Sequence, residues 1–138
     1  MNMALKEAIK AYEEDEIPVG AVIVYQDQII GRGYNQSQRL KDSTAHAEMI
    51  AITSAQNKIG SKYLNGCELY VTLEPCMMCS GAIFLSKISK VVYGLDDKEK
   101  GFLRSSKEHT NKKLKIISNI QEIKSKELLD SFFFKLRS

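Results

Sequence analysis

A chain of 138 residues with 43% hydrophobic content supports one packed domain, here expected to span residues 1–138, and is too short for two. Because no apolar run approaches the roughly 20 residues that cross a bilayer, and no secretory signal opens the chain, we exclude a membrane role and expect a cytoplasmic protein with reduced thiols. The net charge of +3 is unevenly distributed: residues 1–85 contain 7 Lys/Arg and 10 Asp/Glu, whereas residues 86–138 contain 13 Lys/Arg and 7 Asp/Glu. The basic second part fits either a polyanionic partner such as nucleic acid or a solvated lysine-rich surface.

The first half of the chain predicts a helix, a strand hairpin and a second helix. Apolar residues recur at helical spacing over residues 3–12, and the β-branched run "IPVGAVIVY" at 17–25 predicts a strand. A short turn at "QDQ" leads to an antiparallel strand at 29–35, and the polar stretch 36–44 is expected to be a loop. Ser43 or Thr44 is expected to cap the following helix at 45–58.

The second half alternates strands and helices. "CELYVTL" at 67–73 predicts a strand, residues 76–87 have helical spacing, and "KVVYG" at 90–94 is a short strand. A weaker strand at 114–118 precedes a closing amphipathic helix at 121–136. The resulting order αββαβαβ(β)α predicts an α/β fold in which helices cover both faces of a mixed sheet.

Two of the three cysteines, Cys76 and Cys79, lie where the third strand passes into a helix, a place where ligand sites collect in α/β proteins. A C-x-x-C pair is typical of a redox dithiol, of half a structural zinc site, or of two ligands in an open metal site. A structural zinc needs further protein ligands. Cys67, however, alternates with apolar strand residues and is expected to be a buried hydrophobe, and His109 lies in a charged segment where a solvated histidine is expected.

His46 and Glu48 stand among alanines at the start of the second helix, in "TAHAEM". A histidine at a helix start is often a surface residue, but with two cysteines it completes a set of three ligands that suits zinc and leaves a fourth position for water. Positions i and i+2 point about 200° apart on a helix, so one metal should not bind both residues. We therefore expect Glu48 to move protons, and Glu74 to be a strand-end carboxylate. Helix N-termini near residues 44 and 76 should favour thiolates at the site.

The motifs His46-Ala47-Glu48 and Pro75-Cys76-Met77-Met78-Cys79 form the H-x-E and P-C-x-x-C signature of the zinc-dependent nucleoside and base deaminases. Within this cytidine/deoxycytidylate deaminase superfamily, the chain resembles the bacterial tRNA-specific adenosine deaminases over nearly its whole length. The resemblance rests on "IPVGAVIV", "GYN", "TAHAEMIAI", "LYVTLEPCMMCSGAI" and "KVVYG". Guanine and cytosine deaminases share the zinc motifs but more usually have "PFGAV" where this chain has "PVGAV".

The resemblance implies a three-layer, cytidine deaminase-like fold with a mixed five-stranded sheet. It also implies hydrolytic deamination of adenosine to inosine at the wobble position of tRNA anticodons. One zinc ion per chain would be bound by His46, Cys76 and Cys79, and Glu48 would be the catalytic residue that shuttles protons. The implied assembly is a homodimer, in which the apolar segment 77–84, "MMCSGAIF", is either part of the interface or an ordinary core helix.

The resemblance implies three substrate contacts as well. Asn35 would hydrogen-bond the flipped nucleotide, Ile17 would form part of the pocket wall, and Asp97 would contact the backbone or sugar of the anticodon stem-loop.

The segments expected to face RNA depart from the family pattern. Where the family has D-x-K-x-G-A-x-G-S, this chain has "DDKEKGFLRSS", so Phe102, Leu103 and Arg104 replace small residues, and Phe134 and Leu136 stand where arginines are usual. Two alternatives therefore stay open. One is a deaminase for a free base or nucleoside such as guanine or cytosine, and the other is a non-enzymatic, zinc-stapled RNA-binding module.

Overall fold

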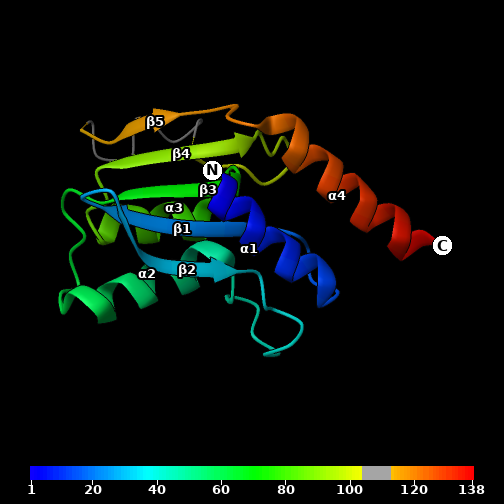
Figure 1. Cartoon of the computed structure of the whole chain (residues 1–138), viewed down its shortest axis with the longest axis horizontal. Helices are drawn as coiled ribbons and strands as arrows, with labels where there is room; N and C mark the ends of the chain where they lie inside the picture. The colour runs from blue at the N-terminus through cyan, green and yellow to red at the C-terminus, as the bar shows by residue number, and fades with distance from the viewer. Residues whose placement is uncertain (104–112) are drawn as a thin grey trace.

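The computed structural model describes residues 1–103 and 113–138, which form a five-stranded mixed sheet between two pairs of helices (Figure 1). The helices are α1 (Asn2–Glu13), α2 (Ala47–Ile59), α3 (Met77–Leu85) and α4 (Glu122–Arg137). The strands are β1 (Gly20–Tyr25), β2 (Gln28–Tyr34), β3 (Glu68–Leu73), β4 (Lys90–Leu95) and β5 (Lys115–Ile117). The predicted element order and the α/β class are confirmed. Arg104 and His109 lie outside the described residues.

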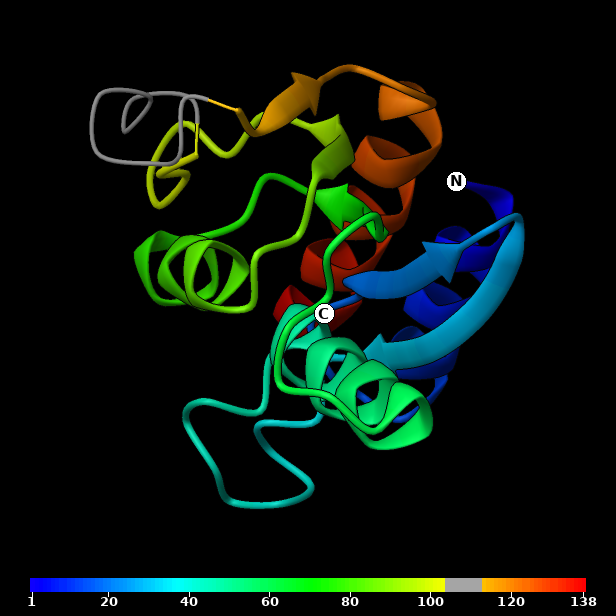
Figure 2. The same ribbon diagram turned by 90° about the vertical axis from the view of Figure 1, so that its left-hand side faces the viewer.

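The sheet has the strand order β2-β1-β3-β4-β5. Strand β1 pairs antiparallel with both β2 and β3, whereas β3, β4 and β5 run parallel to one another. Parallel neighbours need a crossover connection, which α3 supplies between β3 and β4. Helices α1 and α4 contact each other on one face, and α2 and α3 cover the other (Figure 2), so the molecule has three layers.

Glycines in β2 allow α2 to lie close against the sheet. A Cβ atom at Gly33 would collide with the carbonyl oxygen of Ala47, and one at Gly31 would collide with the carbonyl oxygen of Ala51. These contacts fix the direction of α2, since its first turn lies beside the end of β2 and its later turns beside the middle. Ala47 and Ala51 are fully buried, and their small side chains permit this close packing.

One edge of the sheet collects the chain segments that carry the predicted motifs. Because β1 is antiparallel to β2 and β3, its N-terminal end lies beside the C-terminal ends of both neighbours, and Ala21 pairs with Val71 there. The N-terminus of α2 therefore meets the end of β3 and the start of α3 at this edge. The fold brings the H-x-E and P-C-x-x-C segments together although about 30 residues separate them in sequence.

The hydrophobic core lies mainly between the sheet and the α2–α3 layer, and it contains Cys67, as predicted. Leu103 is also fully buried in this core. The leucine that replaces the small residue of the resembled family therefore fills space in the core. Its side chain is not presented to RNA. Among the described residues, no helix combines the length and apolarity that crossing a bilayer requires.

Candidate active site

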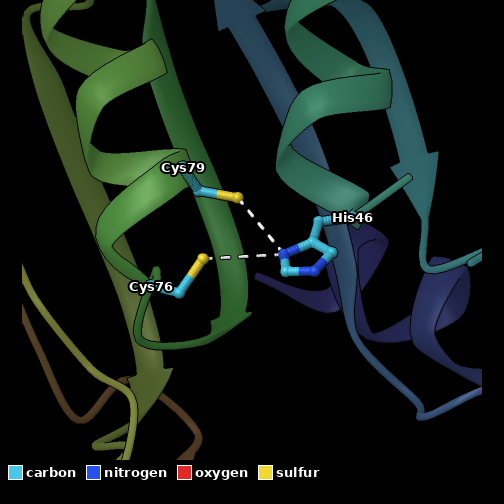
Figure 3. Close-up of side chains that lie close together, drawn as sticks. All are labelled: His46, Cys76 and Cys79. Carbon is cyan, nitrogen blue, oxygen red and sulfur yellow. Dashed lines mark hydrogen bonds between the residues drawn. The ribbon is translucent and has the colours of Figure 1, made fainter. Parts of the chain in front are cut away.

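Three side chains converge at the sheet edge where α2 and α3 begin. The Nδ1 atom of His46 lies 3.6 Å from Sγ of Cys76 and 3.5 Å from Sγ of Cys79 (Figure 3). One ligand atom from each residue lies within 4.8 Å of the other two, and this is the cluster of potential metal ligands found among the described residues. The three predicted ligands are therefore positioned to form a metal site.

The spacing of these atoms can be tested against zinc. A tetrahedral ion with Zn–S bonds of about 2.3 Å and Zn–N bonds of about 2.05 Å holds its sulfur and nitrogen ligands about 3.6 Å apart. The two observed sulfur–nitrogen distances, 3.6 and 3.5 Å, agree with this value. One imidazole and two sulfur ligands are also a donor set that zinc accepts, with one coordination position left over. The residues present thus fit a zinc ion.

Backbone position explains how the ligands reach each other. His46 is the N-cap of α2 and Cys76 is the N-cap of α3, and both have extended backbone conformations without a side-chain capping bond. The prediction that Ser43 or Thr44 caps α2 is wrong. Thr44 instead donates its hydroxyl to Asp42 Oδ1 at 2.7 Å, because Asp42 offers a partner within the preceding loop.

The site favours negative charge on one of its two sulfur atoms, that of Cys76. Hydrogen bonds from Cys79 and His46 lower the pKa of the Cys76 thiol to about 3. The hydrogen bond to Cys76 raises the pKa of His46 in turn, and the hydrogen bond with Cys76 together with burial raises the pKa of Cys79. Both cysteines belong to the first turn of α3, where the helix dipole adds a favourable partial positive charge. The Cys76 thiolate thus gives the site a negative charge that a cation can neutralise.

Glu48 lies in the first turn of α2 and is almost fully buried, with an exposed fraction of 4%. Burial raises the pKa of this carboxyl to about 7, although its own backbone amide, the nearby His46 and a hydrogen bond with Cys79 act in the opposite direction. A carboxyl with this property exchanges protons readily near neutral pH. Glu48 does not belong to the cluster of three ligand atoms, in agreement with the expected separation of roles.

A cavity of about 460 Å³ opens in front of these residues, which is within the range of about 300–1,000 Å³ usual for small-molecule sites. Six of the seven predicted site residues line it: Ile17, Asn35, His46, Glu48, Cys76 and Asp97. The seventh, Cys79, is fully buried behind the lining. The structure therefore brings all seven to one place.

The neighbouring residues Ile17 and Asn35 form one wall of this cavity. The Asn35 carboxamide donates to the carbonyl oxygen of Ile17 at 3.3 Å and accepts from the Ser37 amide at 3.4 Å. Asn35 is 8% exposed, whereas Ile17 is 42% exposed. The amide is thus held in a defined direction, while the isoleucine side chain extends the cavity toward solvent.

The loop that follows β4 also lines the cavity. Glu74, expected to be a strand-end carboxylate, is buried and accepts the Asp97 amide at 3.1 Å. Asp97 in turn accepts the amides of Glu99 and Lys100 at 3.1 Å each, and the loop returns to Cys76 through a bridge at Gly101. A Cβ at Gly101 would collide with the Glu74 carboxylate, so this close return requires glycine. Glu74 thus holds Asp97 beside the metal ligands.

Helix α4 contributes two residues that the sequence did not point to. Leu129 and Phe133 line the cavity, and Phe132 anchors the helix by packing edge-on against Tyr12 of α1 at 6.4 Å. The sequence places these side chains about 50 residues beyond the cysteines. Only the docking of α4 against α1 and β4 brings them to the site, so no local pattern could have identified them.

Comparison with known proteins agrees with this geometry. The family description "Cytidine and deoxycytidylate deaminase zinc-binding region" matches residues 1–95. A tRNA-specific adenosine deaminase of Aquifex aeolicus (strain VF5) is 46% identical over 143 residues, covering 100% of this chain and 94% of the relative. A solved structure from a study of A-to-I editing by tRNA:A34 deaminases at the wobble position of transfer RNA superposes with a TM-score of 0.88, at 39% identity, over 94% of this chain and 97% of the other.

A guanine deaminase structure from Bacillus subtilis is also similar, with a TM-score of 0.66 and 38% identity over 69% of this chain and 61% of that one. The fold and the three-ligand centre define a zinc-dependent deaminase. By its sequence, the chain belongs to the cytidine and deoxycytidylate deaminase zinc-binding family and, within it, to the group that contains the tRNA-specific adenosine deaminases. It is therefore a zinc-binding enzyme of this family, and the alternative of a non-enzymatic RNA-binding module is wrong.

Proposed function

We propose that the chain hydrolyses the wobble adenosine of tRNA anticodons to inosine and ammonia, in the cytoplasm. The observation that carries this proposal is a cavity that joins a three-ligand metal centre to a buried carboxyl and an oriented carboxamide, in a chain similar to tRNA-specific adenosine deaminases along its full length. The cavity is large enough for one base and its sugar, so the target nucleotide enters it by leaving the stack of the anticodon loop.

His46, Cys76 and Cys79 would hold the zinc ion, which supplies Lewis-acid activation of water at neutral pH. Glu48 carries protons at its carboxylate. It accepts a proton from the water that attacks C6 and delivers it to N1 of the purine, and it then transfers the proton of the new hydroxyl group to the amino group, which leaves as ammonia. A pKa of about 7 suits both directions of transfer, since the carboxyl neither holds nor loses its proton strongly near neutral pH.

The remaining lining residues position the substrate. Asn35 presents a carboxamide that donates to and accepts from the sugar or base edge of the flipped nucleotide, and Ile17 packs against the nucleotide from the open side. Asp97 lies on the loop that follows β4 and contacts the backbone or sugar of the anticodon stem-loop. Phe133 lines the cavity from α4 and offers an aromatic face to a base.

We also infer that the active assembly is a homodimer. Helix α3 buries Cys79 and Ile83 but exposes large apolar side chains on its other side, with Met77 at 67%, Phe84 at 48% and Leu85 at 72%. A helix that is apolar on its solvent side needs a partner, and a second copy of the same helix matches it in chemistry. Since the resembled deaminases are homodimers, the segment 77–84 serves both as core helix and as interface.

One alternative keeps support, because the guanine deaminase of Bacillus subtilis is 38% identical over the part it shares with this chain. Steady-state ammonia release separates the two. An anticodon stem-loop with adenosine at the wobble position should be turned over, whereas free adenosine, guanine and cytosine at the same concentration should not. Rapid release from free guanine or cytosine, together with an inert stem-loop, would replace the tRNA assignment by a small-molecule deaminase.

A further inference from the structure

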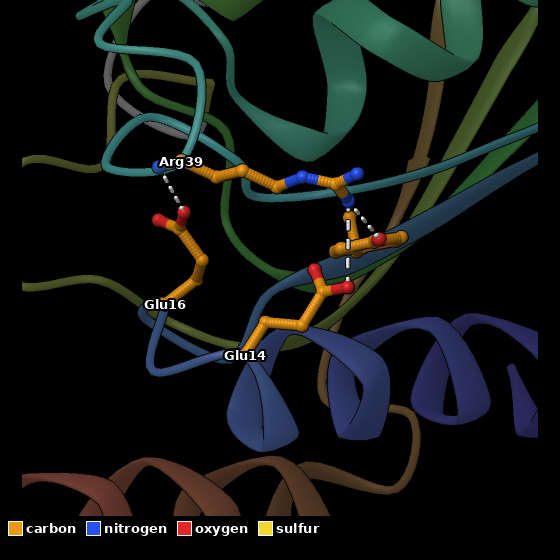
Figure 4. Close-up of polar contacts among 4 residues, drawn as sticks. Glu14, Glu16 and Arg39 are labelled. Carbon is orange, nitrogen blue, oxygen red and sulfur yellow. Dashed lines mark hydrogen bonds and ion pairs between the residues drawn. The ribbon is translucent and has the colours of Figure 1, made fainter.

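A fully buried carboxylate lies outside the catalytic cavity, directly after α1. Glu16 has an exposed fraction of 0%, and its two oxygens accept backbone amides of a loop 22 and 23 residues further along the chain. The Gln38 amide donates to Oε1 at 3.0 Å and the Arg39 amide donates to Oε2 at 2.7 Å; Figure 4 shows the second bond. Burying an acidic side chain is unfavourable unless its oxygens are hydrogen-bonded, and both oxygens of Glu16 meet this condition by binding the loop.

The other tether of this loop is weaker. The Arg39 guanidinium donates to Glu14 Oε1 and to the Tyr34 hydroxyl, each at 3.4 Å, and the paired side chains of Arg39 and Glu14 are 58% and 38% exposed (Figure 4). Exposed pairs of this length contribute little. Among the described residues, the two Glu16 bonds are thus a stronger link between the segment that follows α1 and residues 36–42 than the Arg39–Glu14 pair.

The loop that Glu16 holds begins and ends at the active site. Asn35 precedes it and His46 follows it, and the Gln36 amide closes its base by donating to the Ala45 carbonyl at 3.0 Å. Ser37, next to the held residue Gln38, donates its amide to the Asn35 carboxamide oxygen. The nitrogen of the same carboxamide donates to the carbonyl of Ile17, the residue after Glu16. These two partners of the Asn35 side chain are therefore neighbours of the Glu16 clamp.

We propose that Glu16 is a positioning residue of the deaminase, which orients the Asn35 carboxamide toward the target nucleotide by fixing the loop 36–42 and the backbone at Ile17. Glu16 touches neither substrate nor metal and acts through Asn35. This inference rests on the proposed function for the role of Asn35, but the clamp itself is a feature of the structure and can be measured without substrate.

A double-mutant cycle tests this dependence in single-turnover deamination of the wobble-adenosine stem-loop. Glu16→Ala should slow the chemical step about tenfold or more, since small errors in the placement of a reacting group are costly. Its dissociation constant for the stem-loop and its zinc content should stay near those of the wild type. In the double variant Glu16→Ala/Asn35→Ala, the rate should match that of Asn35→Ala alone within about twofold, because the two residues act in series.

Two further variants separate positioning from general stability. Glu14→Ala removes the exposed pair with Arg39 and leaves both Glu16 bonds, so its rate should equal that of the wild type. Glu16→Gln keeps one acceptor oxygen, so its single-turnover rate should lie between those of the wild type and Glu16→Ala. This variant replaces Glu16→Ala in the test if the alanine variant does not fold. In substrate-free protein, amide hydrogen exchange at Gln38 and Arg39 should accelerate in both Glu16 variants and not in Glu14→Ala.

A wild-type rate in Glu16→Ala and Glu16→Gln would overturn the proposal, as would a double variant whose loss equals the product of the two single losses. If the wild type leaves the stem-loop unchanged, the proposed function fails, and the same cycle is then run with the base that the wild type does deaminate. Unchanged exchange at Gln38 and Arg39 in folded Glu16 variants would overturn the clamp irrespective of substrate.

Discussion

At the scale of single residues, the proposed mechanism assigns metal binding to His46 and proton transfer to Glu48, two positions further along the chain. His46 precedes α2 with an extended backbone, whereas Glu48 belongs to the first helical turn. Two residues inside a helix at this spacing point about 200° apart, but an N-cap does not follow that rule. The change of backbone conformation at His46 is what lets both side chains reach the same cavity from adjacent directions.

The ligand assignment predicts the effect of removing either thiol. Cys76→Ser and Cys79→Ser should each lose most of the one zinc ion expected per chain, because two protein ligands bind zinc much more weakly than three. Elemental analysis of the purified variants measures this directly. Cys67→Ala is the matched control: it removes a buried thiol directly before β3, at the end of the strand away from Cys76, and should retain zinc. Full zinc content in both ligand variants would refute the assignment.

The role of Glu48 predicts a different outcome. Glu48→Ala should bind zinc and fold, yet its turnover should fall by more than the factor of about 10²–10⁴ typical of one general acid or base, because one carboxyl performs several proton transfers. Zinc analysis and circular dichroism establish the intact protein, and stem-loop deamination gives the rate. Activity close to wild type would show that another group moves the protons.

At the scale of elements, the sequence predicted most of what places the metal ligands. β-branched runs identify β1, β3 and β4, and the order of helices and strands fixes the α/β class, because these signals are local. The predicted cap of α2 was wrong because Asp42 competes for Thr44 inside the loop. The Glu16 clamp and the contribution of α4 to the cavity were not predictable, since both depend on contacts between segments distant in sequence.

Helix α4 carries a prediction about RNA affinity. Lys135 already forms an ion pair with Asp15 at 3.0 Å and lies 4.3 Å from the centre of the Tyr12 ring, whereas Arg137 is exposed next to the last residue of the chain. Arg137→Ala should therefore weaken stem-loop binding. The slope of log K against log salt concentration should become shallower by about 0.7–0.9 for each phosphate that is no longer neutralised. Lys135→Ala should have a smaller effect on that slope, because a phosphate must compete with Asp15 for the lysine.

Binding titrations at several salt concentrations measure both slopes, with zinc content as the check on folding. Equal slopes for wild type and Arg137→Ala would place the phosphate contacts elsewhere in the basic second part of the chain. Phe134 and Leu136, which replace the usual arginines, are 70% and 68% exposed beside these cations. The end of α4 thus presents exposed aromatic and aliphatic side chains next to its two cations.

At the scale of the whole molecule, the exposed apolar side of α3 predicts the assembly. Leu85→Glu, combined with Phe84→Glu, should convert the proposed dimer into a monomer at micromolar concentration, because each change places a charge in the proposed contact between two copies. Light scattering gives the mass. Leu40→Glu changes a comparably exposed apolar residue of the 36–42 loop and should leave the dimer intact. A wild-type protein that is monomeric throughout this range would contradict the inference.

The central claim is that this chain deaminates one adenosine at one position of the anticodon. Two stem-loops of identical composition test it, one with adenosine at the wobble position and the other with that adenosine moved one nucleotide in the 3′ direction. After incubation, digestion to nucleosides and mass spectrometry quantify inosine. We expect inosine in the first RNA and none above background in the second, and none in either with Glu48→Ala. Equal inosine in both RNAs, or none in the first, would contradict the claim.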